Sequence, residues 1–212
     1  TITNGGAITG ISFGASGSGG ALTVNASQNL ILDRTGTGTA AVTGISVGGA
    51  VSTIKNIFRN KIYNLQNSNV GVSTSGTVNG ILVLSGTTVN VFNNLVGDLR
   101  APNSNGSDII RGLSVTSTTT SSAINASFNS IYLNASSIGA SFGTSGVFHT
   151  ASTTATTAAL TLRNNIIANL STPNIGGGSI TTTAFRRSTG GASTLANYGS
   201  GSNNNLLYAG TP

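Results

Sequence analysis

The sequence lacks several of the residues that binding and catalytic chemistry uses most. It contains no cysteine and no glutamate, and its only acids are Asp33, Asp98 and Asp108. Without cysteine the chain has neither a disulfide framework nor a thiolate metal site. No apolar run approaches the ~18 residues that cross a bilayer, so no membrane span is expected. Methionine is also absent, even at position 1, so we expect a processed product or a fragment.

Charge is scarce as well. Charged residues make up 6% of the chain, against about 25% in an average globular domain. The formal net charge of +6 comes from nine basic residues. They are Arg34, Lys55, Arg59, Lys61, Arg100, Arg111, Arg163, Arg186 and Arg187. Nucleic-acid-binding proteins concentrate such residues on one face or one element, whereas these are scattered, so no nucleic-acid partner is expected.

What the chain has in excess is a repeat rich in glycine, asparagine and β-branched residues. Its first landmark is a glycine followed by an aliphatic residue, which recurs about every 34 residues. The five instances are Gly10-Ile11, Gly44-Ile45, Gly80-Ile81, Gly112-Leu113 and Gly146-Val147. Valine, isoleucine and threonine favour strands, whereas glycine and asparagine favour turns. Composition and period together indicate a β-repeat protein.

Asparagine marks a second position in each repeat, in the pattern Asn-x-(Ile/Val). Its instances are Asn29/Ile31, Asn60/Ile62, Asn94/Val96, Asn129/Ile131 and Asn164/Ile166. A further asparagine lies four residues upstream, and Asp33, Asn64 and Asp98 lie four residues downstream. We predict that these residues stack in ladders along the fold. The predicted structural ladder comprises Asn25, Asn29, Asn56, Asn60, Asn64, Asn90, Asn94, Asn125, Asn129 and Asn164.

Each repeat contains three short strand signals separated by turns, as in 42–47, 53–58 and 61–65. A period near 34 also fits paired-helix solenoids, but those need helix formers and a 3.6-residue apolar period. We therefore predict an all-β fold, a right-handed parallel β-helix (β-solenoid) of about six coils. Residues 1–212 are expected to form a single domain, in which 175–212 make a divergent last coil.

The aliphatic residues of the two landmarks are predicted to fill the bore of the solenoid. The inward columns are Ile11, Ile45, Ile81, Leu113, Val147 and Ile31, Ile62, Val96, Ile131, Ile166. Asparagine suits the corners because it tolerates left-handed backbone and its amide both donates and accepts hydrogen bonds. Each buried polar group left without a partner would cost about 1–3 kcal/mol. The sequon residues Asn25 and Asn125 would be hidden in such a ladder.

These residues resemble a known group of repeats. The Gly-aliphatic strand, the asparagine ladder and the endings RNNIIANLSTP (163–173) and SNNNLLYAGTP (202–212) look like right-handed parallel β-helix repeats. They are most similar to repeats in large secreted surface proteins of Bacteroidota-type bacteria, within the pectate-lyase-like superfamily. The resemblance covers nearly the whole chain and implies the fold. It implies little about activity, because that superfamily includes lyases, hydrolases, adhesins and structural proteins.

The three aspartates are the candidates for acid–base chemistry. Glycoside hydrolysis uses two carboxylates about 5–9.5 Å apart. Asp33 and Asp98 are expected two coils apart, ~10 Å at ~4.8 Å per coil, with Asn64 on the rung between them. Aspartate replaces asparagine readily at such turns, so a structural role is expected. Asp108 lies in the turn-like segment 102–108 and is expected to be a solvated loop residue.

The remaining candidates are a histidine and two arginines. His149, the only histidine, occupies the column of Phe13, Val47, Val83 and Val115, where it faces the bore or marks a slip of register. A single histidine without neighbouring acids or cysteines makes a poor metal site. Arg59 and Arg163 are expected to share a surface column just before the ladder asparagine, with Asn93 and Phe128 between them. Surface solubility is the favoured role of the two arginines, and sugar binding is the alternative. We therefore assign no catalytic, cofactor-binding or metal-binding residue, and expect no cofactor.

These observations favour a non-enzymatic, extracellular structural protein, secreted to the cell surface. It would be a β-solenoid subunit of a fibre, filament or sheath, with adhesion as a further role. Both ends of the solenoid would present unpaired parallel strands, so copies stack end to end or the coils continue in a longer chain.

The alternative is a β-helix that binds or cleaves polysaccharide. Without an acid cluster it would depend on tyrosines as sugar platforms, and the candidates are Tyr63, Tyr132, Tyr198 and Tyr208. Adhesion to ice through a flat threonine array is a weaker candidate, because the threonine runs do not follow the coil period.

Overall fold

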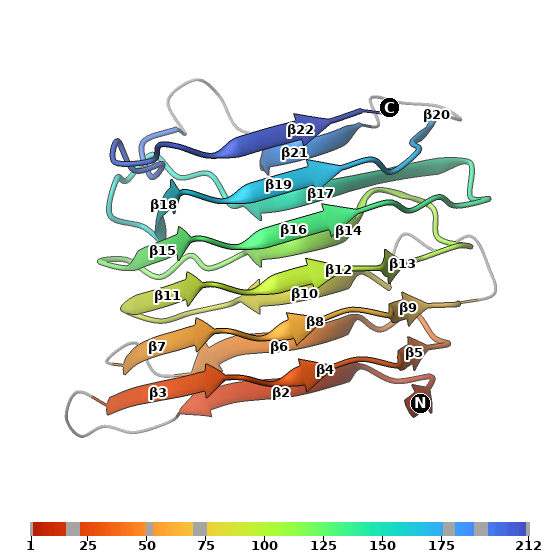
Figure 1. Ribbon diagram of the computed structural model, residues 1–212, viewed down its shortest axis with the longest axis horizontal. Helices are drawn as coiled ribbons and strands as arrows, with labels where there is room; N and C mark the ends of the chain where they lie inside the picture. Colours follow the sequence, from red (N-terminus) through yellow and green to blue (C-terminus); the bar gives the residue numbers. More distant parts are fainter. Residues whose placement is uncertain are drawn as a thin grey trace.

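The computed structural model describes residues 2–15, 22–49, 53–69, 76–175, 181–188 and 195–210. Within these residues the chain winds into a right-handed solenoid of stacked strands and contains no helix (Figure 1). Neighbouring strands on each face belong to successive repeats, because a coil rises by one strand spacing per turn. The predicted all-β, right-handed parallel β-helix is therefore confirmed.

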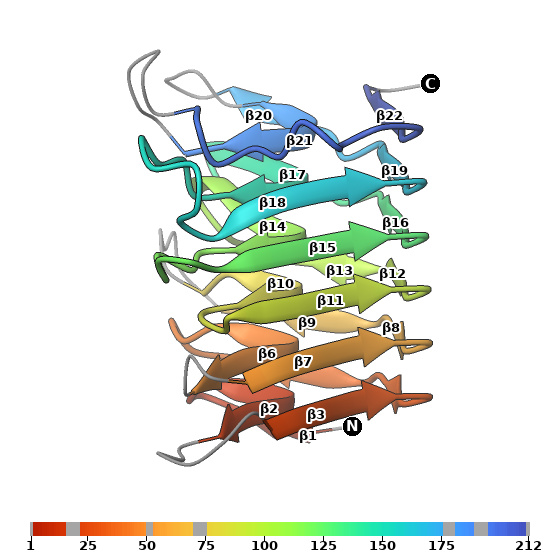
Figure 2. The ribbon, with the colours of Figure 1, turned by 90° about the vertical axis from the view of Figure 1, so that its left-hand side faces the viewer.

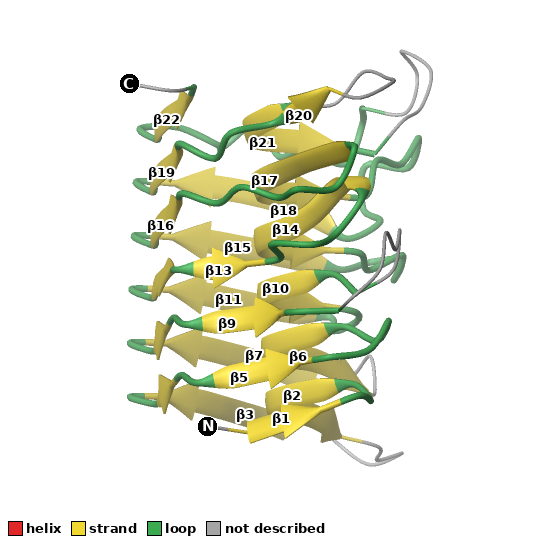
Figure 3. Cartoon of the chain, turned by 90° about the vertical axis from the view of Figure 1, so that its right-hand side faces the viewer, coloured by secondary structure: helices red, strands yellow, loops and turns green. Residues whose placement is uncertain are grey.

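Four sheets form the faces of the solenoid. Sheet A consists of β1 (Ile2–Asn4), β5 (Arg34–Gly36), β9 (Leu65–Asn67) and β13 (Leu99–Arg100), and it faces the viewer in Figure 3. Sheet B consists of β2 (Ile8–Ala15), β6 (Val42–Gly49), β10 (Val78–Val83), β14 (Gly106–Val115) and β17 (Ser141–His149), with β20 (Asn174–Ile175) and β21 (Thr182–Arg187) paired to β17.

The other two sheets meet at the corner that carries the main asparagine ladder. Sheet C, in front in Figure 2, consists of β3 (Leu22–Ser27), β7 (Thr53–Phe58), β11 (Thr88–Phe92), β15 (Ala123–Ser127) and β18 (Ala159–Arg163). Sheet D consists of β4 (Leu30–Ile31), β8 (Lys61–Ile62), β12 (Leu95–Gly97), β16 (Ser130–Leu133), β19 (Ile166–Asn169) and β22 (Leu206–Ala209).

The third predicted strand of the repeat is in fact two strands. The predicted segment 61–65 contains β8 and the first residue of β9, which lie on different sheets. Asn64 stands between them with φ of 55°, a left-handed conformation that turns the chain sharply. Asp33 and Asp98 adopt the same conformation in the coils below and above. A single left-handed residue is therefore enough to close each of these corners.

The bore is filled by the aliphatic columns, with one correction to their register. Ile31, Ile62, Val96 and Ile131 are buried in one column, as predicted. The next member of this column is Ile167, which lies opposite Ile131 and is fully buried. Ile166, the predicted member, is 54% exposed on the outer surface.

The glycine landmark has a steric cause. A Cβ atom built on Gly112 would lie 2.6 Å from the carbonyl oxygen of Gly146, and it would also contact the side chain of Ile131. Gly44 and Gly80 stand in the same relation to the glycine of the coil above. Glycine recurs with the coil period because the backbones of successive coils and the inward column of sheet D leave no space for a side chain there.

The last coil departs from the regular pattern. Strands β21 and β22 continue sheets B and D in parallel register. Between them, Leu195, Tyr198 and Asn203 make isolated bridges to the coil below instead of forming a strand of sheet C. The short β20 is the one described strand that pairs in antiparallel fashion. Within the described residues, this coil therefore adds no strand to sheet C.

Candidate functional site

The inner asparagine ladder follows the corner between sheets C and D. Its rungs are Asn29, Asn60, Asn94, Asn129, Asn165 and Asn205. The backbone N–H and the Nδ2 of Asn94 both donate to Oδ1 of Asn129, at 3.1 and 2.9 Å. The same Nδ2 donates to the carbonyl oxygen of Ile57 in the coil below, at 2.9 Å. The ladder therefore pairs the buried polar groups at a corner where strand pairing stops.

The prediction of Asn164 as a ladder rung is wrong, because Asn129 pairs with Asn165. Asn164 instead belongs to a column of left-handed corner residues whose φ angles lie between 52° and 59°. This corner column comprises Gln28, Arg59, Asn93, Phe128, Asn164 and Asn204. Both asparagines of the Asn164-Asn165 pair fit the Asn-x-Ile pattern, and only the register of β19 against β16 distinguishes them.

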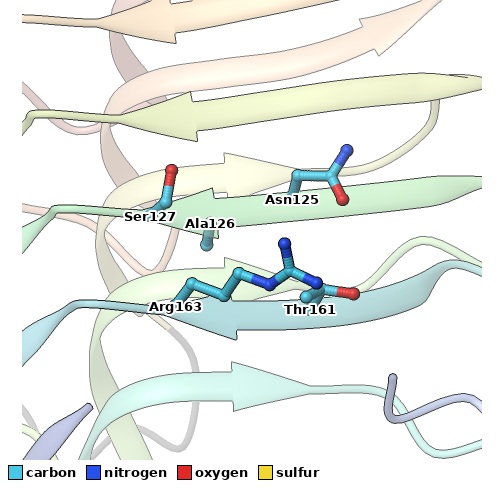
Figure 4. Close-up of a pocket in the computed structure, with 5 residues that line it drawn as sticks. All are labelled: Asn125, Ala126, Ser127, Thr161 and Arg163. Carbon is cyan, nitrogen blue, oxygen red and sulfur yellow. The ribbon is translucent and has the colours of Figure 1, made fainter. Parts of the chain in front are cut away.

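Arg59 and Arg163 differ in position by one residue relative to the corner, as Asn164 and Asn165 do. Arg163 lies opposite Ser127 on the outer face of sheet C, whereas Arg59 is a corner residue. They therefore do not share a column. Arg163 lines a shallow hollow of about 200 Å³ together with Asn125 and Thr161 (Figure 4). Its Nε donates to the carbonyl oxygen of Gly201 at 2.7 Å, so the side chain ties the last coil to the coil below.

The second ladder lies outside the bore. Asn56 donates to Asn25, Asn90 to Asn56 and Asn125 to Asn90, with Nδ2–Oδ1 distances of 2.8 to 3.0 Å. Because side chains alternate along a strand, these residues point outward when the next residue, such as Ile57, points inward. Asn25 and Asn125 are exposed, so the expectation that the ladder hides them is wrong.

Asp33, Asn64 and Asp98 stack in one column, in agreement with the predicted order. Asn64 donates from Nδ2 to the Asp33 carboxylate and accepts from Arg100. Arg100 also pairs with Asp98, with an Nε–Oδ1 distance of 3.1 Å. The two carboxylates are therefore separated by an amide and engaged at left-handed corners. This arrangement supports a structural role for both.

Asp108 is not a solvated loop residue, contrary to expectation. The turn ends before it, and Asp108 lies within β14 with its side chain buried. It accepts hydrogen bonds from Arg111 Nε at 2.8 Å and from Ser145 Oγ at 2.6 Å. A guanidinium nitrogen of Arg186 lies 3.9 Å away. One carboxylate therefore joins three successive strands of sheet B, which sequence proximity alone did not show.

His149 points into the bore and is fully buried. Its Nε2 lies 3.0 Å from the carbonyl oxygen of Ala158 and 3.2 Å from Nδ2 of Asn197. Burial lowers the pKa of His149 from 6.5 to about 4; the hydrogen bond to Ala158 opposes this shift, and the charge of Arg187 adds to it. The imidazole is therefore neutral at pH 7 and acts as a packed core residue.

Lys55 is a buried charge that the sequence reasoning missed. It occupies an inward column between Val24 and Val89 and is fully buried. Its Nζ lies 3.3 Å from the carbonyl oxygen of Ser85, and burial lowers its pKa. The alternation of side chains along the strand could have predicted this burial, because Lys55 lies two residues before the inward-pointing Ile57.

The outer surface of sheet D, which we call the sheet D face, carries six of the exposed large apolar residues of the described part of the chain: Leu30, Leu95, Tyr132, Ile166, Leu206 and Tyr208. Its first column consists of Leu30, Lys61, Leu95, Ser130, Ile166 and Leu206. Its second column consists of Leu32, Tyr63, Gly97, Tyr132, Ala168 and Tyr208. A hollow of about 420 Å³ lies over Gly97, between Tyr63 and Tyr132. The fourth tyrosine, Tyr198, is half-buried, with its ring 5.2 Å from that of Phe185.

Metal ligands do not gather on the described part of the chain. There, no three His, Cys, Asp or Glu side chains lie close enough together to hold a metal ion. The described residues also contain no helix of the length and apolarity that crossing a membrane requires.

Comparison with known proteins gives no match: no family model, no curated protein and no solved structure is similar enough to indicate a relationship. The ladders, the two edges of the described stack and the sheet D face are therefore the features that bear on function.

Proposed function

We propose that this chain is a non-enzymatic, extracellular structural protein, a β-solenoid of a surface fibre, filament or sheath. The observation that carries the proposal is the direction of the inner ladder. Each rung from Asn29 to Asn165 donates its backbone N–H to Oδ1 of the next rung toward the C-terminus, from Asn29 to Asn60 at one end and from Asn165 to Asn205 at the other. A coil added above Asn205 would receive its backbone N–H, and a coil added below Asn29 would donate to its Oδ1.

The two edges of the stack also present residues from inward columns. Leu207 lies opposite the fully buried Ile167 but is itself 46% exposed. At the other edge Ile2 lies in the column of the buried Leu65 and is 49% exposed. Apolar side chains at such positions are buried by another coil in a solenoid. A further coil, from a second copy or from the same chain, is therefore the partner that both edges fit.

The placement of the acids supports a structural role. Asp33 and Asp98 are held at corners, and Asp108 joins strands of sheet B. A glycosidase needs one carboxyl group free to donate a proton beside a second that acts as base or nucleophile. Secretion and surface location rest on composition and on the resemblance to surface repeats of the pectate-lyase-like superfamily, and they belong to the proposal.

Electron microscopy of the purified chain at neutral pH tests axial growth. We expect fibres with an axial repeat of ~29 Å, the height of six coils at ~4.8 Å each. Leu207→Glu places a charge in the joint between copies. The single copy should tolerate this change, because the side chain at position 207 is already about half exposed there. This variant should remain dispersed, and Thr88→Glu on the outer face of sheet C should still form fibres. A wild-type chain that stays dispersed at all concentrations excludes growth by a second copy.

Polysaccharide binding is the second candidate, and one observation favours it. Tyr63, Tyr132 and Tyr208 stand on alternate coils of the sheet D face, where their rings form a row of potential sugar platforms. A panel of soluble polysaccharides in affinity electrophoresis tests this, with Tyr132→Ala as the variant and Tyr198→Phe as the control. Retardation of wild type and control but not of the variant would support it.

A further inference from the structure

A groove crosses the sheet D face at the level of β12 and runs across the stack of coils. β12 lies between β8 and β16, with Leu95 opposite Lys61 and Ser130 (Figure 1). The hollow over Gly97 lies on one side of Leu95, and a second hollow of about 370 Å³ lies on the other side, beside the corner residue Asn93. Lys61 and Leu95 line both hollows, so the two are parts of one groove.

At one end the groove is a slot between two tyrosines. Tyr63 in the coil below and Tyr132 in the coil above stand on either side of Gly97. A Cβ atom built on Gly97 would meet one atom within 4 Å, the carbonyl oxygen of Tyr132 at 3.3 Å, so the space over the glycine is open. β8 and β16 are two strand spacings apart, ~9.6 Å. The slot therefore admits a single thin chain and excludes an α-helix, which is ~10 Å across.

The other end of the groove is basic. In the corner column, Arg59 lies below Asn93 and Phe128 lies above it. Lys61 joins the two ends, with its Nζ 5.3 Å from the centre of the Tyr63 ring. Among the described residues, no carboxylate forms an ion pair with Arg59 or Lys61. Both cations are exposed, so they attract negative charge to this part of the groove.

The one carboxylate that lines the groove does not cancel this charge. Asp98 stands at the end next to Gly97, and its Oδ1 already pairs with Nε of Arg100 at 3.1 Å. At the rim of the slot this carboxylate is an acceptor for hydroxyl groups. The groove therefore combines an aromatic slot, a hydrogen-bond acceptor at one end and unpaired positive charge at the other.

We infer that this groove binds a single chain of an acidic polysaccharide, which lies across the coils. One sugar ring occupies the slot over Gly97, where the rings of Tyr63 and Tyr132 contact its apolar faces. A carboxylate or sulfate group further along the sugar chain is held by Arg59 and Lys61. This inference rests on polysaccharide binding, the second candidate function, and adds to it the site, the direction of the sugar chain and its charge.

The groove suits a sugar chain better than a peptide. It runs over the outer face of sheet D, where β12 pairs with β8 on one side and with β16 on the other. It therefore offers no free strand edge to which a peptide could add as a further strand. Recognition is left to aromatic walls and a few polar side chains at the rim, which is typical of sites for small polar ligands.

Isothermal titration calorimetry tests the inference, because it counts sites per chain whether or not the chain forms fibres. The probes are an oligouronate, a sulfated oligosaccharide and a neutral oligoglucose of matched length. We expect at least one acidic probe to bind at one site per chain, about tenfold or more tightly than the neutral probe. Its affinity should fall as the salt concentration rises. The acidic probe that binds identifies the charged group as carboxylate or sulfate.

Two variants locate the site. Gly97→Val fills the slot while keeping both tyrosines, and valine favours a strand. It should weaken binding of the acidic probe at least about tenfold, a loss of ~1.4 kcal/mol. Arg59→Gln should also weaken it, and the corner accepts glutamine because Gln28 has the same left-handed conformation in the coil below. The controls are Arg163→Gln, which loses the same charge on sheet C, and Tyr208→Ala, which removes a tyrosine of the same column outside the groove. Both should leave the affinity unchanged.

Urea unfolding of each variant checks the fold, and Tyr132→Ala takes the place of Gly97→Val if that variant does not fold. Equal affinity for the neutral probe, or equal losses in Arg59→Gln and Arg163→Gln, overturns the inference. Binding that Tyr208→Ala weakens and Gly97→Val does not would place the sugar chain along the row of tyrosines. That result overturns the groove and keeps the second candidate function, whereas a chain that binds no probe overturns both.

Discussion

The side-chain amide of Asn94 donates to Oδ1 of Asn129 across 2.9 Å, although 35 residues separate the two in sequence. The same Oδ1 accepts the backbone N–H of Asn94 at 3.1 Å. Repeated at each coil, this pair converts a sequence period into a stack with a fixed direction. The ladder is therefore both the main polar stabilisation of the corner and the basis of the proposed axial growth.

Removing an inner rung should be costly. In Asn94→Ala, the backbone N–H and the Nδ2 of Asn60 lose the Oδ1 to which they donate. The carbonyl oxygen of Ile57 loses its bond from Nδ2 of Asn94. We expect a loss of about 3 kcal/mol or more in the free energy of unfolding, measured by urea denaturation. The matched control is Asn90→Ala on the outer ladder, where water replaces the lost bond and the loss should stay below ~1 kcal/mol. Equal losses would show that the inner ladder is not the stronger of the two.

Phe128 should be replaceable with a gain in stability. It is an exposed phenylalanine with φ of 56°, and it lies in the corner column between Asn93 and Asn164. A left-handed conformation costs a residue with a bulky side chain roughly 1 kcal/mol. Phe128→Asn should therefore raise the urea midpoint, by up to about 1 kcal/mol in the free energy of unfolding.

Phe128→Ala separates relief of backbone strain from loss of an exposed ring. Alanine keeps the β-carbon that disfavours the left-handed region, so this variant should gain less than Phe128→Asn. If both variants gain equally, exposure of the aromatic ring and not the backbone conformation is the cause.

His149 should make stability depend on pH between about 4 and 6.5. Burial holds its folded-state pKa near 4, below the ordinary value of 6.5. The unfolded chain therefore binds the proton first as the pH falls, and the folded state loses about 1.4 kcal/mol per pH unit in this window. The contribution is complete above pH 6.5. Urea midpoints at pH 7, 6, 5 and 4.5 measure the slope.

The matched variant is His149→Val, since valine occupies this column in Val47, Val83 and Val115. Its stability at pH 7 differs from wild type because the hydrogen bond to Ala158 is lost. The informative quantity is the slope, which should be smaller in the variant. A variant with the wild-type slope would assign the acid sensitivity to other groups.

The glycine landmark predicts a steric effect that depends on position. Gly112→Ala brings a methyl group to 2.6 Å from the carbonyl oxygen of Gly146 and into contact with Ile131. Overpacking of this kind costs about 1–3 kcal/mol, so the melting temperature should fall by several degrees. Gly14→Ala, where an added Cβ meets no neighbour within 4 Å, should leave it nearly unchanged. Similar effects at both sites would mean that the close approach of the coils is relieved by a small shift.

Much of the fold could be predicted because the chain repeats. The Gly-aliphatic and asparagine landmarks keep one period, and a solenoid satisfies every copy of such a pattern in the same way. The period identified the inward column of sheet B and the first four members of the inward column of sheet D, and it identified the ladder rungs Asn29, Asn60, Asn94 and Asn129. It failed at Asn164 because two adjacent asparagines match one motif, and a shift of one residue exchanges the inside and the outside of the fold.

The sequence by itself therefore determined the coil, since short-range patterning specifies strands and corners and the period specifies how they stack. Only the tertiary structure decided what the coils bring together: Asp108 with Arg111 and Ser145, Lys55 inside the bore, and three tyrosines on one face. The physical reason is that these contacts depend on where each corner places the next strand. A single left-handed residue sets that direction, and the linear pattern carries no mark of which neighbouring residue adopts it.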